Sequence, residues 1–547
     1  MAEGTNAASR QRMQVTASCD VVAVTVDGVL YKPLRAQIAE QALRMPDKTY
    51  VYAIDQDKSL TYGDLHRIGN RIAQYLRDRG IKANDRILML SENSAEFMAI
   101  FLGVQRYGAT IATANIEMNR SHIAEIIKVI GPKLVLAQEG LGLESLRDSC
   151  TGQHWVAIGD WNARGGSSGF FGAIEKYSDD KELKEISRPE DIAAIFYTSG
   201  TEAKPKGVAQ SHLSVWANFD AAKDCVEIGE DDRLLDCRSH TWMSAQIMSL
   251  GAPLFAGATV YIAKKFSRSR YFDWVRDYCI TIAVSVPAIL NMLINEPVNI
   301  RGEELPDLRF VMTSSAAMLP KRWREFEDMY GMTVCQSCGC SEAGLMFSHR
   351  GVRRKIGTVG LPLKYQTLRL LDQNGREVGP GQAGEITVSG PQLSYGYLKP
   401  DGSIQRLRES GHRTGDLGVI DEHGHVTIVG RLKDLIIRGG VNISPLEIDN
   451  ILSRHPDIIE GASVGIPDEI YGEEVVAYVV ARPGSKLSAT DVIAHCGRFL
   501  PPFKTPKAIR FIDDMPKNAR GKLDRAALTA EWRQNATEET RDPLNET

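Results

Sequence analysis

The first two-thirds of the chain alternates between strand-like and helix-like patterns of apolar residues. Residues 86–90 and 191–197 are short apolar runs, which are typical of strands buried on both faces. Residues 61–80, 95–107 and a segment from about Ser211 repeat apolar side chains at helical spacing. Strands that alternate with helices predict parallel sheets covered by helices.

The pattern changes near Leu368, where alternating residues and the turn pairs Asn-Gly and Pro-Gly predict β-hairpins. It changes again at Lys433, after which a small α/β unit is expected. The expected elements of this unit are helices at 444–453 and 489–499 and strands near 462–464 and 475–480.

These changes divide the chain into four parts. Residues 1–18 and 534–547 are polar and are expected to form disordered tails. Residues 19–432 are predicted to form a large N-terminal domain of parallel α/β sheets, with a β-rich part at about 350–432. Residues 433–533 are predicted to form a small C-terminal α+β domain. The predicted fold class is therefore α/β.

Composition narrows the class of protein. Of 547 residues, 43% are hydrophobic and 24% are charged, as in a globular protein. The formal net charge of -4 argues against a nucleic-acid binder, which would usually be basic. No apolar stretch is long enough for a membrane span, and the polar N-terminus does not resemble a signal peptide. Nine cysteines, an odd number, fit free thiols, so a cytoplasmic location is expected.

The strongest chemical signal is residues 197–207, with the sequence YTSGTEAKPKG. Backbone N–H groups near glycine, hydroxyl donors and lysine ammonium groups all suit a polyphosphate. The segment is not a Walker loop, because no Gly-Lys-Ser/Thr follows the spacer. By itself it is equally compatible with a solvated basic turn.

Further motifs follow this segment in a fixed order. They are residues 338–342 (CGCSE), 413–416 (RTGD), 430–434 (GRLKD), 438–440 (RGG) and 521–522 (GK). Together with residues 197–207, they resemble the superfamily of AMP-forming adenylating enzymes, which contains acyl-CoA synthetases, peptide-synthetase adenylation domains and firefly luciferase. The resemblance extends from about residue 30 to 530.

The resemblance implies a reaction in two halves. A carboxylate attacks the α-phosphorus of Mg-ATP and gives an acyl adenylate and pyrophosphate, after which a thiol displaces AMP. The first half brings an anion to a polyanion, so the site must supply cations and fixed hydrogen-bond donors. ATP, Mg²⁺ and coenzyme A are the expected cofactor and co-substrates, and a small carboxylic acid is the expected substrate.

The same resemblance implies a role for each motif residue. Lys522 would be the catalytic lysine, and Glu342 and His240 complete the catalytic set. Glu342 and Thr201 would hold Mg²⁺, a hard cation that prefers oxygen ligands. The residues expected to bind ATP or AMP are Thr198, Ser199, Gly200, Thr201, Lys206, Ser315, Ala316, Ser341, Asp416 and Arg431.

A mobile C-terminal domain is also implied by the resemblance. Lys433 stands at the hinge position. Rotation about it would bring Lys522 to the site for adenylation, and then Gly439 and Gly440 for thiol transfer. Glycines there would let the pantetheine arm of coenzyme A pass close to the backbone.

The chain departs from the family pattern at several positions. Glu202 and Ala203 replace Thr-Gly in the phosphate segment, so we expect either weaker ATP binding or a Glu202 that points outward. Cys338 replaces a tyrosine that would stack on adenine, and the usual tryptophan before 413–416 is absent. Cys335, Cys338 and Cys340 do not have the spacing of a zinc ribbon, and we expect pocket-lining thiols rather than a metal centre.

The identity of the acid is predicted less narrowly. His240 fits a gating histidine of acyl-CoA synthetases, and no aspartate stands there to pair an amino-acid ammonium group. The expected acyl pocket consists of His240, Trp242, Met243, Gln246, Ser315, Cys338, Gly339 and Met346. This set favours a medium-sized aromatic, alicyclic or aliphatic neutral acid, although Arg238 leaves a dicarboxylic acid open.

The leading hypothesis is an AMP-forming carboxylic acid–CoA ligase. One alternative is a stand-alone adenylating enzyme that loads a carrier-protein thiol, and another is a degenerate nucleotide-binding protein. A homodimer is left open.

Overall fold

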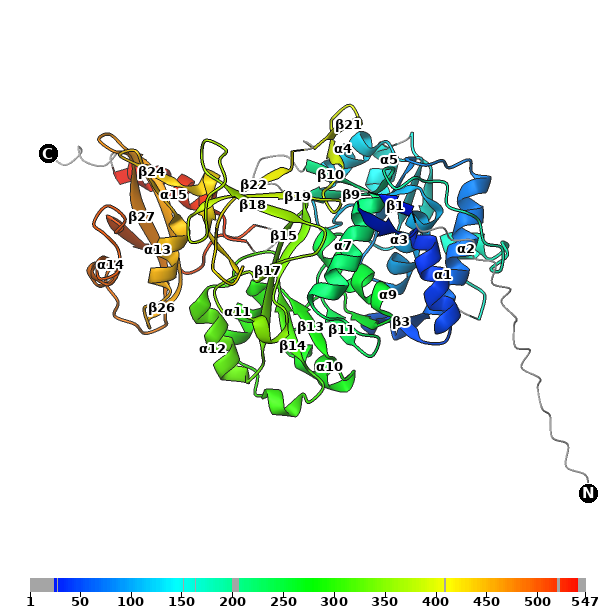
Figure 1. Cartoon of the computed structure of the whole chain (residues 1–547), viewed down its shortest axis with the longest axis horizontal. Coiled ribbons are helices and arrows are strands. Elements are labelled where there is room, and N and C mark those ends of the chain that lie inside the picture. Colours follow the sequence, from blue (N-terminus) through cyan, green and yellow to red (C-terminus); the bar gives the residue numbers. More distant parts are fainter. Residues whose placement is uncertain are drawn as a thin grey trace, which may run out of the picture.

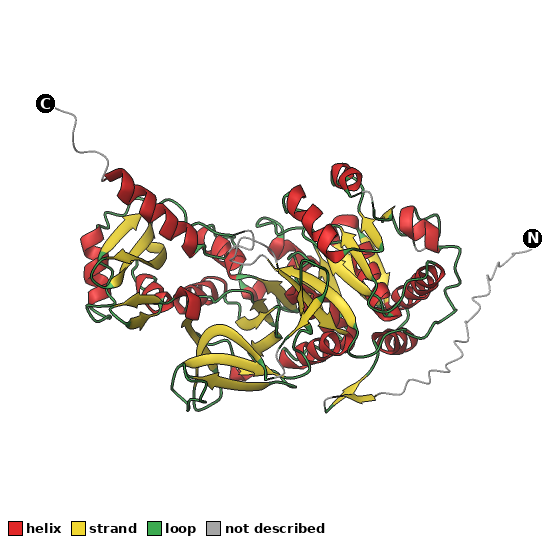
Figure 2. Cartoon of the chain, turned by 90° about the horizontal axis from the view of Figure 1, so that it is seen from above, coloured by secondary structure: helices red, strands yellow, loops and turns green. Residues whose placement is uncertain are grey.

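A computed structural model of the chain describes residues 24–26, 28–150, 152–162, 164–198, 206–407, 410–518 and 522–539. Two large sheets flanked by helices fill one side of the molecule, and a C-terminal unit that begins near β24 lies at the opposite end (Figure 1). Seen from above, helices cover the large sheets and a small twisted sheet stands apart from them (Figure 2). The predicted α/β fold class is confirmed.

The first large sheet has eight strands in the order β21-β20-β10-β9-β6-β5-β7-β8. The run from β9 to β8 is parallel, whereas β10, β20 and β21 extend it in antiparallel fashion. The strands are β5 (Arg86–Leu90), β6 (Thr110–Thr113), β7 (Leu134–Ala137), β8 (Trp155–Ala157), β9 (Ile192–Thr198), β10 (Lys206–Ser211), β20 (Gly396–Leu398) and β21 (Ile404–Arg406).

The second large sheet has nine strands in the order β17-β16-β15-β14-β13-β11-β12-β3-β4. Its interior is parallel, and β4, β16 and β17 pair in antiparallel fashion at the two edges. The strands are β3 (Thr49–Ala53), β4 (Lys58–Thr61), β11 (Arg233–Asp236), β12 (Thr259–Ile262), β13 (Ile282–Ser285), β14 (Phe310–Thr313), β15 (Val334–Cys340), β16 (Gly344–Ser348) and β17 (Leu361–Pro362).

The helices around these sheets begin and end where local signals predict. Thr61 and Asp64 form a reciprocal capping box at the start of α2, as expected. Helix α3 and strand β5 have the predicted bounds, and Ser211 caps α7. The helices of this part are α1 (Leu34–Arg44), α2 (Tyr62–Asp78), α3 (Ala95–Tyr107), α4 (Arg120–Ile130), α5 (Glu144–Ser149), α6 (Gly169–Ile174), α7 (His212–Cys225), α8 (Met243–Gln246), α9 (Ala252–Ala256), α10 (Tyr271–Asp277), α11 (Pro287–Asn295) and α12 (Pro320–Tyr330).

The expected β-rich part is a four-stranded antiparallel sheet in the order β18-β19-β22-β23. A short helical turn at Leu432–Asp434 leads from it into the C-terminal unit, and this turn contains the predicted hinge residue Lys433. The strands are β18 (Thr367–Leu371), β19 (Gly384–Ser389), β22 (His412–Ile420) and β23 (Val426–Arg431). A separate hairpin near the N-terminus pairs β1 (Val24–Val26) with β2 (Val29–Tyr31).

The C-terminal unit is a five-stranded sheet with helices packed against it. Its elements are β24 (Ile436–Arg438), β25 (Val441–Ile443), β26 (Ile458–Asp468), β27 (Gly472–Ala481), β28 (Ala508–Phe511), α13 (Pro445–Leu452), α14 (Ala489–Gly497) and α15 (Arg525–Glu539). Helix α15 includes residues 534–539, which the sequence analysis placed in a tail. Among the described residues, no helix combines the length and the apolar character needed to cross a bilayer.

Candidate active site

The turn that carries Ser341 and Glu342 lies between β15 and β16 and is held from both sides. The carbonyl oxygen of Ser341 accepts hydrogen bonds from Gln210 Nε2 at 3.0 Å and from Ser394 Oγ at 2.6 Å. The backbone N–H of Ser394 donates to the Glu342 carbonyl at 2.8 Å. Tyr397 Oη donates to Glu342 Oε1 at 2.9 Å, which fixes the carboxylate. The carboxylate proposed for Mg²⁺ is therefore positioned before any ion binds.

Gly339 is required at the start of this turn. A Cβ at this position would lie 2.2 Å from the carbonyl oxygen of Gly344, which is a backbone atom and cannot rotate away. The pairing of β15 with β16 shifts register between Cys338 and Gly339. The sheet pairing continues beyond this irregularity, with Gly339 opposite Leu345 and Cys340 opposite Gly344, so the turn with Ser341 and Glu342 follows directly.

Asp416 and Arg431 face each other across β22 and β23, where they are paired residues in the antiparallel register. The Arg431 guanidinium donates to the buried carboxylate of Asp416. Burial alone would lower the pKa of Arg431, but the hydrogen bond to Asp416 outweighs it and the pKa is raised. The ion pair joins Asp416, the predicted ribose ligand, to β23, the strand that leads to the predicted hinge residue Lys433.

Lys522 belongs to the C-terminal unit, yet its charge acts on the Cys338 thiol of the N-terminal part. Burial raises the pKa of the Cys338 thiol to about 12, and the negative charge of Asp416 adds to the shift. The positive charges of Lys522 and Arg431 act in the opposite direction, toward a lower pKa. The backbone near Lys522 is anchored, because the N–H of Asn518 donates to the Lys522 carbonyl at 2.8 Å. The charges of Asp416, Arg431 and Lys522 therefore all act on the Cys338 thiol.

His240 is fully buried at the start of the expected acyl pocket. Its backbone N–H donates to Asn93 Oδ1 at 2.8 Å, and its carbonyl accepts from Gln246 Nε2 at 2.6 Å. Neither ring nitrogen has a hydrogen-bond partner within the described residues. Burial lowers the pKa of His240 to about 4, so the ring is neutral at neutral pH.

Arg238, left open as a partner for a second substrate carboxylate, is already paired. Its Nε and Nη2 atoms donate to the Asp236 carboxylate at 2.7 to 3.1 Å, and Nη1 donates to Ser314 Oγ at 3.1 Å. Both charged side chains are buried. Burial would raise the pKa of Asp236, but Arg238 outweighs this and lowers it. The arginine charge is therefore neutralised inside the protein.

The other acyl-pocket residues come from several elements. Met243 and Gln246 are buried on α8, and Met346 is buried on β16. Ser315 has a left-handed backbone with φ of 75°, which is uncommon for a residue with a side chain. Trp242, Ser315 and Cys338 are half-buried, and Gly339 is exposed. Gln336 Nε2 donates to the carbonyl of Ala316 at 3.4 Å, which holds the predicted adenine segment.

Part of the predicted phosphate segment lies outside the described residues, namely residues 199–205, which include Ser199, Gly200, Thr201, Glu202 and Ala203. The ends of this segment are described: Thr198 on β9 pairs with Lys206 on β10, and Lys206 is exposed. Strand β10 was not predicted from the sequence, because the Gly-Val-Ala-Gln run within it is too short to show the alternation of apolar and polar residues typical of a strand.

Gly439 and Gly440 form the two-residue turn between β24 and β25. Both have positive φ, at 57° and 81°, as this turn type demands. A Cβ on Gly440 would meet nothing within 4 Å. The turn geometry alone therefore explains both glycines, and their role in coenzyme A binding stays a prediction.

Several residues that build the site were missed from the sequence. They are Asn93, Gln210, Asp236, Ser394 and Tyr397. Gln210 links three parts of the site, since its Nε2 also approaches Met243 Sδ at 3.4 Å. A buried glutamine inside an apolar strand was the one available signal, because such a group needs partners.

The thiols of Cys335, Cys338 and Cys340 do not come together as the three ligands of one metal centre. Among the described residues, no group of potential metal ligands combines Cys335, Cys338 and Cys340. His349, nine residues after Cys340, is the nearest histidine that could have added a fourth ligand, but its ring makes other contacts. Its Nδ1 accepts from the Gln336 N–H at 3.1 Å, and its Nε2 lies 3.0 Å from Thr358 Oγ1.

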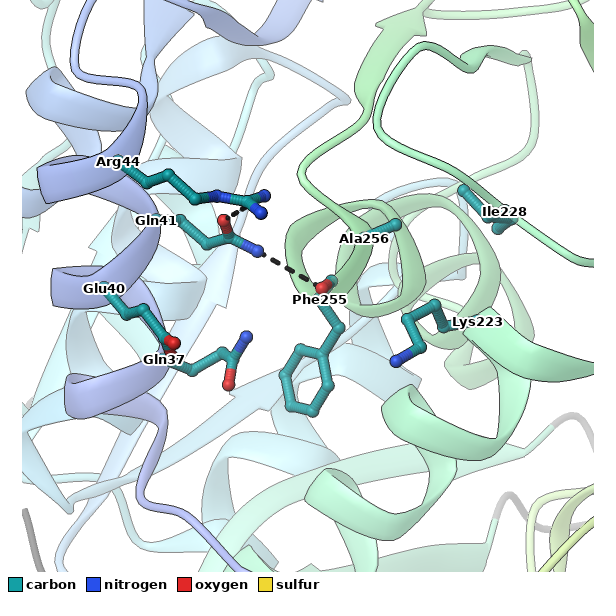
Figure 3. A pocket seen from close by; sticks show the side chains of 8 residues that line it. All are labelled: Gln37, Glu40, Gln41, Arg44, Lys223, Ile228, Phe255 and Ala256. Carbon is teal, nitrogen blue, oxygen red and sulfur yellow. Dashed lines mark hydrogen bonds between the residues drawn. The ribbon is translucent and has the colours of Figure 1, made fainter.

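A hollow of about 330 Å³ between α1, α7 and α9 contains none of the predicted site residues (Figure 3). Gln41 Nε2 there donates to the carbonyl oxygens of Leu254 at 3.0 Å and Phe255 at 3.2 Å. Arg44 Nη2 donates to Gln41 Oε1 at 3.0 Å. These polar groups hold the helices together and do not constitute the active site.

Two family models match the chain. The AMP-binding enzyme model covers residues 38–398, and the AMP-binding enzyme C-terminal domain model covers residues 447–522. The chain belongs to the AMP-binding enzyme family. This identification confirms the resemblance inferred from the motifs.

Known proteins similar to this AMP-binding enzyme include two CoA ligases. The enzyme is 32% identical over 509 residues to sulfoacetate–CoA ligase of Cupriavidus necator, covering 91% of this chain and 98% of the relative. It is 29% identical over 495 residues to oxalate–CoA ligase of Arabidopsis thaliana, covering 88% and 95%. ATP-bound MatB from Rhodopseudomonas palustris has a similar structure, with a TM-score of 0.82, 27% identity and coverage of 91% and 99%.

The enzyme is an AMP-forming acid–CoA ligase. Its cofactor and co-substrates are Mg²⁺, ATP and coenzyme A. The predicted enzyme class and cofactors are therefore confirmed.

Proposed function

We propose that the enzyme activates a compact carboxylic acid that carries a second polar group, and joins it to coenzyme A through an acyl adenylate. The observation that carries this proposal is a set of buried polar atoms at the acyl site. The two ring nitrogens of His240 and Oε1 of Gln246 are buried without a hydrogen-bond partner among the described residues. A buried polar atom that lacks a partner costs about 1–3 kcal/mol, so a substrate that supplies one gains binding energy.

The space behind α8 favours a compact acid. A cavity lined by Phe196, Met243, Gln246 and Ile247 has a volume of only about 10 Å³, enough for one water molecule. A long acyl chain directed past Met243 would have to displace packed core side chains, which costs several kcal/mol. This proposed acid is smaller and more polar than the medium-sized neutral acid expected from the sequence, and so departs from that expectation.

The two relatives named above support the same reading, because sulfoacetate and oxalate are both short acids with a second acidic group. In this chain Arg238 is neutralised by Asp236. We therefore propose that the second group is recognised by hydrogen bonds rather than by a free positive charge.

The residues that we assign to the adenylation half-reaction act by position and charge. Glu342, oriented by Tyr397, would hold Mg²⁺, which supplies charge neutralisation at the phosphates of ATP when bound. Asp416 would accept hydrogen bonds from the ribose hydroxyls. Lys522 would place its ammonium between the acid carboxylate and the α-phosphate and neutralise the charge that builds there.

The thiol half-reaction needs a different part of the C-terminal unit. We propose rotation about Lys433, in the short turn between β23 and β24, which would exchange Lys522 for the Gly439–Gly440 turn. Open space at Gly440, where a Cβ would meet nothing within 4 Å, suits the narrow pantetheine arm. A single connecting turn between two packed units permits such a movement.

A substrate panel tests the proposal. The panel pairs acids of two to four carbons that carry an additional hydroxyl, amide, carboxylate or sulfonate group with matched acids that lack it. Benzoate and octanoate are included for comparison. The readout is AMP release that depends on coenzyme A. We expect kcat/KM for the best compact polar acid to exceed that of its apolar match by about 100-fold. Benzoate or octanoate as the best substrate would refute the proposal. Pyrophosphate release without coenzyme A, with AMP release only when a carrier-protein thiol is added, would favour the carrier-protein alternative.

A variant at Gln246 links the result to the site. Gln246→Leu should lower kcat/KM for the polar acid by about tenfold or more, and should change that for the matched apolar acid little. The apolar acid serves as the internal control for folding. An equal loss for both acids would count against Gln246 as a specificity residue.

We also propose a cytoplasmic location. The cysteines within the described residues are all unpaired, which fits a reducing compartment. The homodimer that the sequence left open stays a prediction.

A further inference from the structure

Three potential metal ligands converge at the turn that carries Glu342. Cys340 ends β15, Glu342 lies in the following turn, and His412 begins β22 on the small sheet. Their ligand atoms, Sγ, a carboxylate oxygen and a ring nitrogen, all lie within 4.8 Å of one another. The three side chains are half-buried, so solvent and small ions can reach them. No other described group of His, Cys, Asp and Glu residues meets the same condition.

The donor set differs from what Mg²⁺ requires. Mg²⁺ prefers oxygen ligands, whereas a thiolate, an imidazole and a carboxylate together suit Zn²⁺ and related transition-metal ions. In a tetrahedral zinc site, ligand atoms stand about 3.3–3.8 Å apart, given metal–ligand distances of about 2.0–2.3 Å. Movements of about 1 Å would therefore close the site. Three protein ligands leave a fourth position open, as in exchangeable rather than structural zinc sites.

The surroundings favour an ion at this place. Tyr397 Oη donates to Glu342 Oε1 at 2.9 Å, which orients the carboxylate and leaves its other oxygen available. The turn itself is fixed by Gln210 and Ser394. A thiolate and a carboxylate together balance the charge of a divalent ion, so the bound site carries no excess charge.

We propose that Cys340, Glu342 and His412 form a binding site for a thiophilic divalent cation such as Zn²⁺ within the nucleotide cleft. The bound ion takes the Glu342 carboxylate and so competes with Mg²⁺-ATP, which makes the ligase sensitive to free zinc. The competition rests on the proposed role of Glu342 in binding Mg²⁺. The metal site itself does not depend on that role.

The site is tested with Co²⁺ as a spectroscopic probe on the full-length protein without ATP. We expect one Co²⁺ per chain with a thiolate-to-cobalt charge-transfer absorption in the near ultraviolet. Cys340→Ser should abolish this absorption, and Cys338→Ser, two residues away, should keep it. His412→Asn should weaken Co²⁺ binding by roughly 10- to 100-fold. Circular dichroism and thermal unfolding of each variant establish that the fold is intact.

Several outcomes would overturn the inference. They are the absence of the absorption in the wild-type protein, its survival in Cys340→Ser, or unchanged affinity in His412→Asn. Because this measurement uses neither acid nor coenzyme A, its failure would leave the ligase proposal standing.

Competition is measured separately, by titrating Zn²⁺ into the wild-type protein with and without Mg²⁺-ATP. The expected result is weaker apparent Zn²⁺ binding as Mg²⁺-ATP increases. Zinc affinity that does not respond to Mg²⁺-ATP would refute the competition.

Discussion

Individual charges in the cleft are largely paired before substrates bind. Asp416 is paired with Arg431, and Asp236 with Arg238. Because each arginine in these pairs is already neutralised by an aspartate, it offers little free positive charge to ATP or to an acid anion. Additional cations are therefore needed to stabilise the negative charge of the reacting groups. We propose that Lys522, whose charge acts on Cys338, supplies one such charge from the C-terminal unit.

Replacing Lys522 tests this role. In Lys522→Ala we expect acid-dependent pyrophosphate release to fall by about 100- to 1,000-fold, because charge building at the α-phosphate loses its counter-charge. Conversion of a supplied acyl adenylate to acyl-CoA should stay near the wild-type rate. Lys517→Ala is the matched control, since Lys517 lies in the same segment but pairs with Glu460. Undiminished adenylation in Lys522→Ala would contradict the assignment.

Buried histidines give stability a dependence on pH. Burial lowers the pKa values of His212, His240 and His349 to about 4, below the unfolded value of about 6.5. Well above pH 6.5, for example at pH 7.5, these rings are almost entirely neutral in both states and contribute almost no pH dependence. As pH falls from 6.5 toward 4, only the unfolded chain gains protons, so the free energy of unfolding decreases, by about 2 kcal/mol per histidine at pH 5.

Urea denaturation at pH 7.5 and pH 5.0 measures this loss. His240→Gln should make the decrease between the two pH values smaller by about 2 kcal/mol, whatever its effect at pH 7.5. An unchanged decrease in His240→Gln would show that this ring is protonated in the folded protein.

At the scale of elements, the β15–β16 turn is the part of the fold on which the chemistry depends most. It carries Ser341 and Glu342, begins with the bulge at Gly339, and is held by Gln210 from β10. Two sheets thus meet at one turn. A shift of this turn by 1 Å would move the Glu342 carboxylate away from where it is needed, and such shifts are costly in catalysis.

Gly339→Ala tests the bulge. The added Cβ would meet the Gly344 carbonyl oxygen at 2.2 Å, so the turn must move. We expect adenylation to fall by about tenfold or more and the melting temperature to drop by a few degrees. Gly379→Ala is the control, because a Cβ there meets nothing within 4 Å. Equal activity of the two variants would argue against a positioning role for the bulge.

At the scale of the whole molecule, polar contacts between described residues cross from the N-terminal part to the C-terminal unit. Lys321 Nζ on α12 donates to the His455 carbonyl at 3.0 Å, and Arg482 pairs with Glu325 at 3.5 Å. The Arg482–Glu325 pair is partly exposed, and such ion pairs are worth about 1 kcal/mol or less. A partly exposed ion pair of this kind is compatible with the domain exchange proposed above.

Loosening these contacts should affect the two half-reactions differently. The double variant Lys321→Met/Arg482→Ala should lower adenylation by about two- to fivefold, since the orientation that presents Lys522 becomes less populated. Conversion of a supplied acyl adenylate to acyl-CoA should stay equal or increase. Lys486→Ala, an exposed lysine near Arg482, is the control. Equal loss in both half-reactions would contradict domain exchange.

Local patterns in the sequence were sufficient for much of the fold. The apolar run of β5 and the helical spacing of α3 predicted their bounds, because burial repeats with the period of each element. The capping box of α2 depends on two residues three positions apart. The order of the motifs was sufficient for the family and the enzyme class.

Contacts between distant segments were decided by the tertiary structure alone. No local pattern links Cys340 to His412, or Gln210 to Ser341, since the residues of each pair are far apart in the chain and share no periodicity. Whether Arg238 could bind a substrate depended on Asp236 being turned toward it in a buried pair. The sequence therefore determined the elements and the class of reaction. The packing of two sheets and a C-terminal unit determined which charges, thiols and polar atoms meet at the candidate site. Such meetings depend on distances between segments far apart in the sequence, and only the folded chain fixes those distances.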